Sequence, residues 1–400
     1  MFRVRFLLIL CCALGILLPA PSRASMPPGH LYAAMEAYRR MPERLREVVR
    51  MNWNAYILGA QGHDLAYWAP SSFFIKFISG NRSPIDFVYR LYYKDSPGKF
   101  FHEDEKTGQL ILGMLHRITE TTRRYGGYPT RDDPRLAFAL GWMTHYVTDL
   151  YIHTLVERYG GVYLPGAGET RHVQLELLES KHIMQNYRLP RMHFVPDREA
   201  FRFLSRVLAD IYPDQKAYKP KDGPYALVSP KGGIPEYAPE LDMDSPDFVE
   251  MLENGCFIMN DAMECLQESA RTGKNDCSGI SRYGWLFLMD TDLVSSHAYG
   301  RLMNPIEIQT VPEPENIRVT ATIHDYGIYG KFCRDWDRVM VQAVNRNVAV
   351  FNAVEAAFAE LEASPPQVPA DRPLPAGLKA VFKDYNILSP EKSSVSLPED

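Results

Sequence analysis

Residues 141–153, which read GWMTHYVTDLYIH, decide how this chain folds. His145, Asp149 and His153 follow one another at intervals of four residues. In an α-helix, four residues rotate by about 40° beyond a full turn and rise by about 6 Å, so the three side chains project from one side. Bulky apolar residues surround them, and a buried His/Asp/His series needs a partner for its polar atoms. The pattern therefore predicts metal ligands on a buried helix. The alternative is a set of His–acid pairs that stabilise a surface helix.

A second pair of the same kind follows downstream. His172 and Glu176 are also separated by four residues, and His172 lies nineteen residues beyond His153. The combined set offers nitrogen and oxygen ligands without cysteine, which suits zinc in an open, catalytic site. We therefore expect both segments to contribute to one metal centre.

Composition excludes several classes of protein. The chain has 400 residues, of which 46% are hydrophobic and 23% charged, so it is not a disordered, collagen-like or coiled-coil protein. Its formal net charge of −5 gives no basic footprint, and no nucleic-acid partner is expected. The motifs GxxxxGK[ST], GxGxxG and GxSxG do not occur, so P-loop, dinucleotide-binding and serine-hydrolase functions have no support in the sequence.

The N-terminus has the pattern of a signal peptide. Arg3 and Arg5 precede an apolar run at 6–18, and small residues follow up to Ala24. The run is shorter than the roughly 20 residues that span a bilayer. We predict that residues 1–24 are cleaved and that the protein is exported, to a periplasm or to the outside, the alternative being an uncleaved anchor. An oxidising compartment would favour two disulfides of unassigned pairing among the remaining cysteines, which are Cys256, Cys265, Cys277 and Cys333.

Helical periodicity dominates the rest of the chain. It predicts helices at 31–40, 42–58, 105–124, 135–158, 170–187, 198–212, 246–272 and 334–363, a long loop at 216–244, and a β-like alternation at 317–323. The expected fold is an all-α, multi-helix bundle around the metal site, formed by residues 25–275. A C-terminal extension of mixed helix and short strand at 276–363 would pack on the bundle or continue it. Residues 364–400 are expected to be a loosely ordered tail.

These motifs resemble those of the zinc-dependent phospholipase C family. The resemblance is closest to the branch that includes the catalytic domain of glycosylphosphatidylinositol-specific phospholipase D. It covers roughly residues 28–190, and its matching segments are Gly29-His30, Gly59-Ala60-Gln61-Gly62-His63-Asp64, Phe101-His102-Glu103, the series at 145–153, and His172-Val173-Gln174-Leu175-Glu176.

The resemblance implies two or three zinc ions. The ligands it assigns to the first ion are His102, His145, Asp64 and Asp149. Those of the second are His153, His172 and Glu176, and the third would be held by His30 with a shared Asp149. It further implies a phospholipase C activity in which a hydroxide between the metals attacks the phosphorus of a glycerophospholipid, with Asp64 as the catalytic base. Diacylglycerol and a phosphorylated headgroup would be the products.

The sequence departs from the family pattern at two places. His63 stands where the family has proline, and we expect it either to hold a ligand in place or to be an ordinary turn residue. The Asp149–His153 interval is two residues shorter than in the secreted bacterial enzymes, and it agrees with the phospholipase D branch. Two other functions remain open: a zinc-dependent nuclease or nucleotidase of related fold, and a metal-binding protein without catalysis.

An aromatic segment lies between Asp64 and His102. It includes Phe73, Phe74 and Phe77. The two interpretations are transient contact with a membrane surface, where aromatic rings favour the headgroup layer, and a buried helix of the bundle. The substrate would be a phospholipid or another phosphodiester in either case, and the sequence does not predict an oligomeric state.

Overall fold

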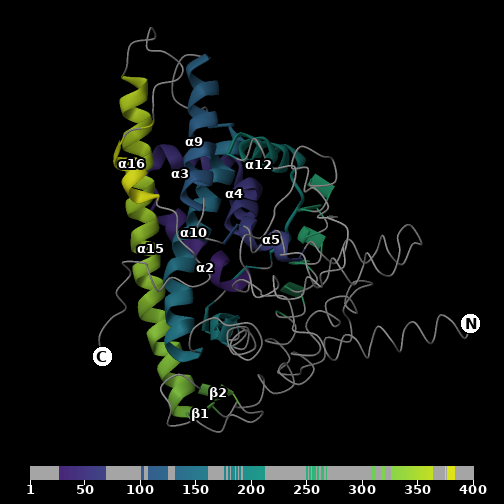
Figure 1. The fold of residues 1–400 in the computed structure, drawn as a ribbon, viewed down its shortest axis with the longest axis vertical. Helices are drawn as coiled ribbons and strands as arrows, with labels where there is room; N and C mark the ends of the chain where they lie inside the picture. The colour runs from purple at the N-terminus through teal and green to yellow at the C-terminus, as the bar shows by residue number, and fades with distance from the viewer. Residues whose placement is uncertain are drawn as a thin grey trace, which may run out of the picture.

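The computed structural model describes residues 27–68, 101–102, 107–124, 131–160, 192–211 and 326–363, and parts of 175–190, 249–267, 308–319 and 374–382. Its helices are α2 (Pro27–Arg39), α3 (Glu43–Met51), α4 (Trp53–Ala60), α5 (Gly62–Trp68), α9 (Thr107–Arg124), α10 (Pro134–Gly160), α12 (Arg198–Ile211), α15 (Tyr326–Glu362) and α16 (Ala376–Val381) (Figure 1). Two three-residue strands, β1 (Ile308–Thr310) and β2 (Ile317–Val319), pair antiparallel with Ile308 opposite Val319. The described part is a helical bundle, which confirms the all-α prediction. None of the helices described is both long enough and apolar enough to cross a membrane.

Helix α10 forms the centre of the bundle. Every residue from 136 to 150 is buried, and α10 contacts α2, α3, α4, α5, α9, α12 and α15. A helix that is apolar on all sides belongs inside a protein, because it has no face to offer to water. Figure 1 shows α15 running alongside α10, with α2, α4 and α5 on the other side of α10 in this view. His145, Asp149 and His153 therefore lie in the middle of the core.

A pair of glycines lets α4 approach α10 closely. A Cβ atom on Gly141 would lie 2.0 Å from the backbone oxygen of Tyr56, and one on Gly59 would lie 2.0 Å from the backbone oxygen of Phe138. Backbone atoms cannot move aside as the end of a flexible side chain does, so only glycine fits at this crossing. The close approach matters for the site, because α5 and Asp64 follow directly after α4.

Several helix boundaries near the N-terminus differ from those predicted from the sequence. The helix expected at 42–58 is divided at Asn52, whose backbone has φ −126° and ψ 42°. The Asn52 side chain donates hydrogen bonds to the carbonyls of Val48 and Arg131, both at 2.9 Å, and so stabilises the break. α2 begins at Pro27 rather than residue 31, and α5 was not predicted. The described residues of 175–184 and 249–267 are helical, as expected.

The C-terminal helices pack on the same core. The Tyr159 hydroxyl in α10 donates a 2.6 Å hydrogen bond to Asp335 in α15. Within the stretch 364–400, where loose order was expected, α16 forms a short helix that contacts α15. Leu378 and Phe382 are buried, and the Phe382 ring lies 6.3 Å from that of Tyr146. These two buried apolar residues attach this part of the tail to the bundle. The Pro and Ser content of the whole stretch predicted loose order and did not reveal them.

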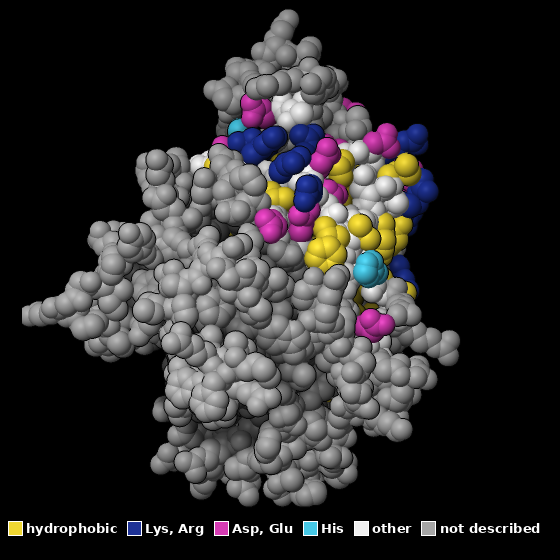
Figure 2. All heavy atoms as spheres, turned by 90° about the vertical axis from the view of Figure 1, so that its right-hand side faces the viewer, with side chains coloured by type: hydrophobic (Ala, Val, Ile, Leu, Met, Phe, Trp, Pro, Cys, Tyr) yellow, Lys and Arg dark blue, Asp and Glu magenta, His cyan; other side chains and the backbone are white. Residues whose placement is uncertain are grey.

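Charges of both signs share the described surface. Figure 2 shows Lys and Arg side chains lying beside Asp and Glu side chains on the described part of one face. Ion pairs also join neighbouring elements, as where Arg117 of α9 contacts Asp210 of α12 at 2.6 Å. Exposed pairs of this kind contribute little stability, about 1 kcal/mol at most. The bundle is therefore held together mainly by its buried apolar residues.

Candidate metal centre

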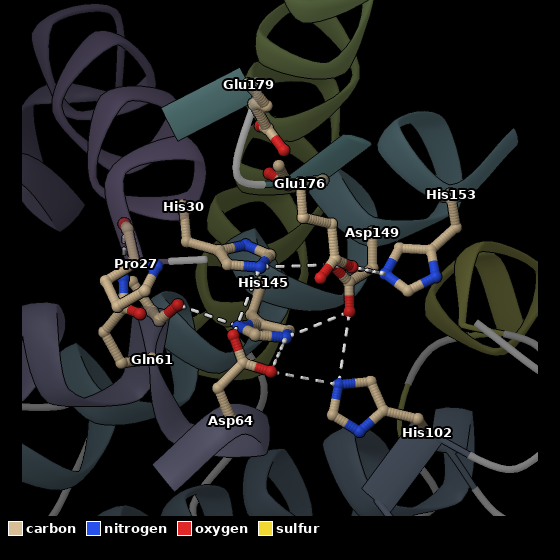
Figure 3. A network of polar contacts seen from close by, with 12 residues as sticks. Pro27, His30, Gln61, Asp64, His102, His145, Asp149, His153, Glu176 and Glu179 are labelled. Carbon is tan, nitrogen blue, oxygen red and sulfur yellow. Dashed lines mark hydrogen bonds and ion pairs between the residues drawn. The ribbon is translucent and has the colours of Figure 1, made fainter. Parts of the chain in front are cut away.

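Four separate parts of the chain bring histidines and carboxylates together around α10 (Figure 3). The first turn of α2 supplies His30, α5 supplies Asp64, and the helical pair at 101–102 supplies His102. The side chains that α10 and residue 176 contribute are those of His145, Asp149, His153 and Glu176. Of the eight ligands predicted from the sequence, seven are described and all seven are fully or almost fully buried. The eighth, His172, lies outside the described residues.

Asp149 lies at the middle of the cluster. Its Oδ1 atom is 3.2 Å from Nε2 of His30 and 3.6 Å from Nε2 of His153. Its Oδ2 atom is 3.0 Å from Nε2 of His145 and 3.3 Å from Nε2 of His102. One carboxylate therefore faces four imidazole rings, two on each oxygen.

Asp64 faces three of the same rings from the opposite side. Its Oδ2 atom lies 3.5 Å from Nε2 of His30, and its Oδ1 atom lies 3.4 Å from Nε2 of His102 and 3.7 Å from Nε2 of His145. Two groups of three ligand atoms have the spacing of a metal site, namely His30 with Asp64 and His145, and His102 with His145 and Asp149. His145 belongs to both groups, so the two candidate sites adjoin.

The tautomer of the neutral His145 ring is set by the α4 backbone. Its Nδ1 atom lies 2.9 Å from the carbonyl oxygen of Ala60. A carbonyl oxygen only accepts hydrogen bonds, so Nδ1 carries the proton and donates it. Nε2 is left with a lone pair that points toward the two aspartates, which is the arrangement that a metal-binding imidazole requires.

The polar atoms of this cluster fit a metal better than they fit one another. Within the described part of the chain, both oxygens of Asp64 and of Asp149, and Nε2 of His30 and of His145, have no hydrogen-bond partner. Glu176 adds a third buried carboxylate, with Oε1 3.8 Å from Nε2 of His153. Three carboxylates in an apolar interior require compensating positive charge. Divalent cations with nitrogen and oxygen ligands supply that charge, and zinc suits this donor set.

The electrostatics of the metal-free cluster follow from burial and proximity. Burial opposes the charge of Asp149, but His145, His30 and His153 together hold the pKa of its carboxyl well below the usual value. Burial, and then the neighbouring His145, lowers the pKa of His30. Burial also acts to lower the pKa of His102, but Asp149 and Asp64 outweigh it and raise that pKa to about 9. At neutral pH, His102 therefore carries a proton that a metal must displace.

Metal loading should consequently release a proton from His102. A pKa of about 9, above the ordinary 6.5, means that the site competes with protons throughout the neutral range. We expect calorimetric titrations with zinc, made in buffers of different ionisation enthalpy, to show about one more proton released per chain at pH 7 than at pH 9.5. The variant His102→Gln should lack this difference. Equal proton release at the two pH values in the unaltered protein would contradict the assignment.

His63 takes a place in the site that the sequence left open. Its ring stacks on that of His145 with centroids 4.3 Å apart and planes at 14°, and it lies 4.1 Å from the ring of Trp142 on its other side. On the opposite face of His145, the ring of His30 stacks at 3.7 Å and 13°. Burial, with His145 and His102, holds the pKa of His63 well below its usual value, so the ring is neutral. His63 thus lies in α5 and stacks on a predicted ligand, rather than occupying an ordinary turn.

The other histidines lie outside the cluster or outside the described residues. His182 forms a 2.8 Å hydrogen bond with Asp337 of α15. His116 is half-buried and His193 is exposed, while His297 and His324 lie outside the described residues. Residues 69–100 of the aromatic segment between Asp64 and His102 also lie outside the described residues, while Phe101 at its end is buried. Cys256 and Cys333 are buried, but Cys265 and Cys277 are not described, so the disulfides stay a prediction.

Glu179 is a polar residue of this region that sequence reasoning missed. It is fully buried, and Oε1 accepts a 2.8 Å hydrogen bond from Nε1 of Trp336 in α15. The same oxygen would lie 2.2 Å from a Cβ atom on Gly29, the residue before His30. The sequence places Glu179 three residues after Glu176, on the same side of a helix. Two glutamates at this spacing are common in helices, so without a histidine beside them the spacing did not indicate a role for Glu179.

Comparison with known proteins agrees with this geometry. Residues 29–219 match the family model described as zinc dependent phospholipase C. A search of the curated proteins and a search of the solved structures gave no match. The matched region includes every ligand predicted from the sequence, from His30 to Glu176. The region at 29–219 is therefore similar to the zinc-dependent phospholipase C family.

Proposed function

We propose that this protein is an exported, zinc-dependent phosphodiesterase of phospholipase C type. The observation that carries the proposal is the buried cluster of His30, Asp64, His102, His145 and Asp149, whose ligand atoms face one another inside the region that matches the family. The expected reaction is hydrolysis of the headgroup phosphodiester of a glycerophospholipid, which leaves diacylglycerol and a phosphorylated headgroup.

The ligand set would hold two or three zinc ions. Asp149 has an oxygen directed to each of two pairs of histidines, and it is suited to bridge adjacent ions. His153 and Glu176, with His172, would hold a further ion at the edge of the cluster. When bound, zinc would polarise the phosphodiester oxygens and stabilise the negative charge that develops on them.

The chain's own residues supply positioning and proton transfer. Asp64 faces three histidines through two oxygens that have no hydrogen-bond donor among the described residues. A carboxylate oxygen that stays free of metal would accept a proton from the attacking water, which makes Asp64 the proposed base. The Ala60 carbonyl holds the proton of His145 on Nδ1, so that Nε2 stays available as a ligand.

Metal analysis and a substrate panel test this function together. We expect the purified mature protein to contain two or three zinc ions per chain, because seven described ligands are too many for one tetrahedral site. It should release diacylglycerol from phosphatidylcholine or phosphatidylinositol vesicles, lose that activity on chelation, and recover it with zinc. Less than one equivalent of zinc after zinc-replete expression would contradict the proposal. Hydrolysis of single-stranded DNA in place of either lipid would favour the related nuclease function, and full zinc with neither activity would favour a non-catalytic metal-binding protein.

Export is tested separately. Expression of the full chain should yield a processed protein that begins at or near residue 25 and is recovered from the periplasm or the medium. This proposal rests on the charged, apolar and small-residue pattern of residues 1–24. A protein retained in the cytoplasm with its N-terminus intact would contradict it.

A further inference from the structure

Helix α15 lies beyond the region that matches the family, yet it contacts two helices that carry predicted ligands. The match ends at residue 219, and α15 covers residues 326–362. α15 contacts both α2, which carries His30, and α10, which carries three of the predicted ligands. We infer that Glu179 is a positioning residue for the metal centre and that Trp336 of α15 is its anchor. This inference rests on the proposed metal-dependent function.

The first step of the argument is the pair itself. Both side chains are fully buried, and the indole N–H of Trp336 donates a 2.8 Å hydrogen bond to Oε1 of Glu179. A buried carboxylate is costly unless it is hydrogen-bonded, so the indole N–H fixes where this oxygen lies. The apolar body of Trp336 packs within an aromatic group that includes Tyr32 of α2, at a centroid distance of 5.6 Å.

The second step is the contact between Glu179 and the start of α2. Oε1 of Glu179 would be 2.2 Å from a Cβ atom on Gly29, and Ile152 of α10 would be 3.4 Å from the same atom. The Glu179 oxygen is thus packed directly against the first turn of α2, where Pro27 and Pro28 have no N–H group, those of Gly29 and His30 have no partner within the helix, and the helix dipole favours an anion. His30 is the next residue, so a shift of this turn moves a predicted ligand.

The third step is the position of Glu179 beside the other ligands. It follows Glu176 by three residues, and Figure 3 shows it at the edge of the cluster next to Glu176. The hydroxyl of Ser180 donates a 3.0 Å hydrogen bond to the carbonyl of Glu176, which orders the same turn. Glu179 therefore connects two ligands from different elements, His30 and Glu176, and α15 holds that connection in place.

Three variants and one control test the inference. Trp336→Phe keeps the apolar ring but removes the N–H donor, and Glu179→Gln keeps the shape but removes the charge. Gly29→Ala places a methyl group where Oε1 lies, and since alanine favours helices more than glycine, any loss of metal affinity would not reflect a weaker α2. The control is Tyr159→Phe, which removes another buried hydrogen bond to α15, the 2.6 Å contact with Asp335, without touching Glu179.

The measurements are zinc affinity by competition with a chromogenic chelator and the visible spectrum of the cobalt-substituted protein. We expect the three variants to bind zinc about 10- to 100-fold more weakly, as when other partners of metal ligands are removed, and to change the cobalt spectrum. Tyr159→Phe should lose comparable thermal stability to Trp336→Phe but keep the zinc affinity and the spectrum of the unaltered protein.

The outcomes separate this inference from the function on which it rests. Unaltered protein that binds zinc tightly, with Trp336→Phe and Tyr159→Phe indistinguishable in affinity and spectrum, would overturn the positioning role alone. Unaltered protein that binds no zinc would overturn the metal centre and the inference with it. If Glu179→Gln fails to fold, Trp336→Phe and Gly29→Ala decide the matter, because neither buries a new polar group.

Discussion

Replacing Asp149 by Asn should remove metal from the site of His102, His145 and Asp149, weaken binding at the adjoining site through His30, and reduce phosphodiester hydrolysis by a factor of about 1,000 or more, equivalent to about 4 kcal/mol of transition-state stabilisation. The reason is geometric. Oδ1 of Asp149 faces His30 and His153, and Oδ2 faces His102 and His145, all at 3.0 to 3.6 Å. An amide keeps the shape but loses the charge, and it presents an N–H₂ group to one of the two pairs. Zinc content and vesicle hydrolysis measure the effect.

Glu176→Gln is the matched control for Asp149→Asn. It makes the same chemical change to another fully buried carboxylate, whose Oε1 atom lies 3.8 Å from His153 at the edge of the cluster. We expect Glu176→Gln to lose less metal and less activity than Asp149→Asn. If the two variants keep equal zinc and equal hydrolysis, Asp149 is not a more central ligand than Glu176.

Replacing Gly141 by Ala should destabilise the whole bundle, by about 3 kcal/mol or more, which is at the upper end of the usual cost of overpacking. The added methyl group would lie 2.0 Å from the Tyr56 carbonyl and 2.7 Å from the backbone nitrogen of Ala60. Two helices must separate to admit it, and Ala60 is the residue that fixes His145. The unfolding free energy, from denaturant titration of the metal-free protein, checks this expectation.

Gly113→Ala provides the comparison for Gly141→Ala. It makes the same change within helix α9, but the nearest atoms to the new Cβ are side-chain atoms of Val207 and Ile211, both at 3.0 Å. Side chains adjust where backbone does not, and alanine gains about 1 kcal/mol of helix propensity over glycine. We therefore expect Gly113→Ala to be close to neutral. A Gly141→Ala variant that is equally neutral would contradict the close crossing of α4 and α10.

The sequence predicted what depends on local spacing. The four-residue intervals of His145, Asp149 and His153 placed three side chains on one side of α10, since helical geometry is the same in every protein. Asp64 and His102 have no such spacing, and they were predicted through the family resemblance. The structure brings all five to one buried cluster, with His172 outside the described residues.

The rest could not be predicted, because it depends on contacts between distant segments. The stacking of His63 on His145 follows from the approach of α4 and α10, and nothing near residue 63 reveals it. The contact between Glu179 and Trp336 joins residues that are 157 positions apart. Asn52 breaks a helix through a carbonyl of Arg131, 79 residues away. Periodicity describes one element at a time, and these features belong to pairs of elements.

The column of rings formed by His30, His145, His63 and Trp142 has a thermodynamic consequence. His145 lies between two rings at 3.7 and 4.3 Å, and Trp142 closes the column at 4.1 Å from His63. A side chain enclosed in this way cannot turn about its Cβ–Cγ bond without displacing its neighbours, and close-packed interiors leave no room for that. The freedom of this imidazole is lost when the chain folds, before any metal arrives. The entropy of ordering this ligand is therefore part of the free energy of folding and is absent from the free energy of metal binding.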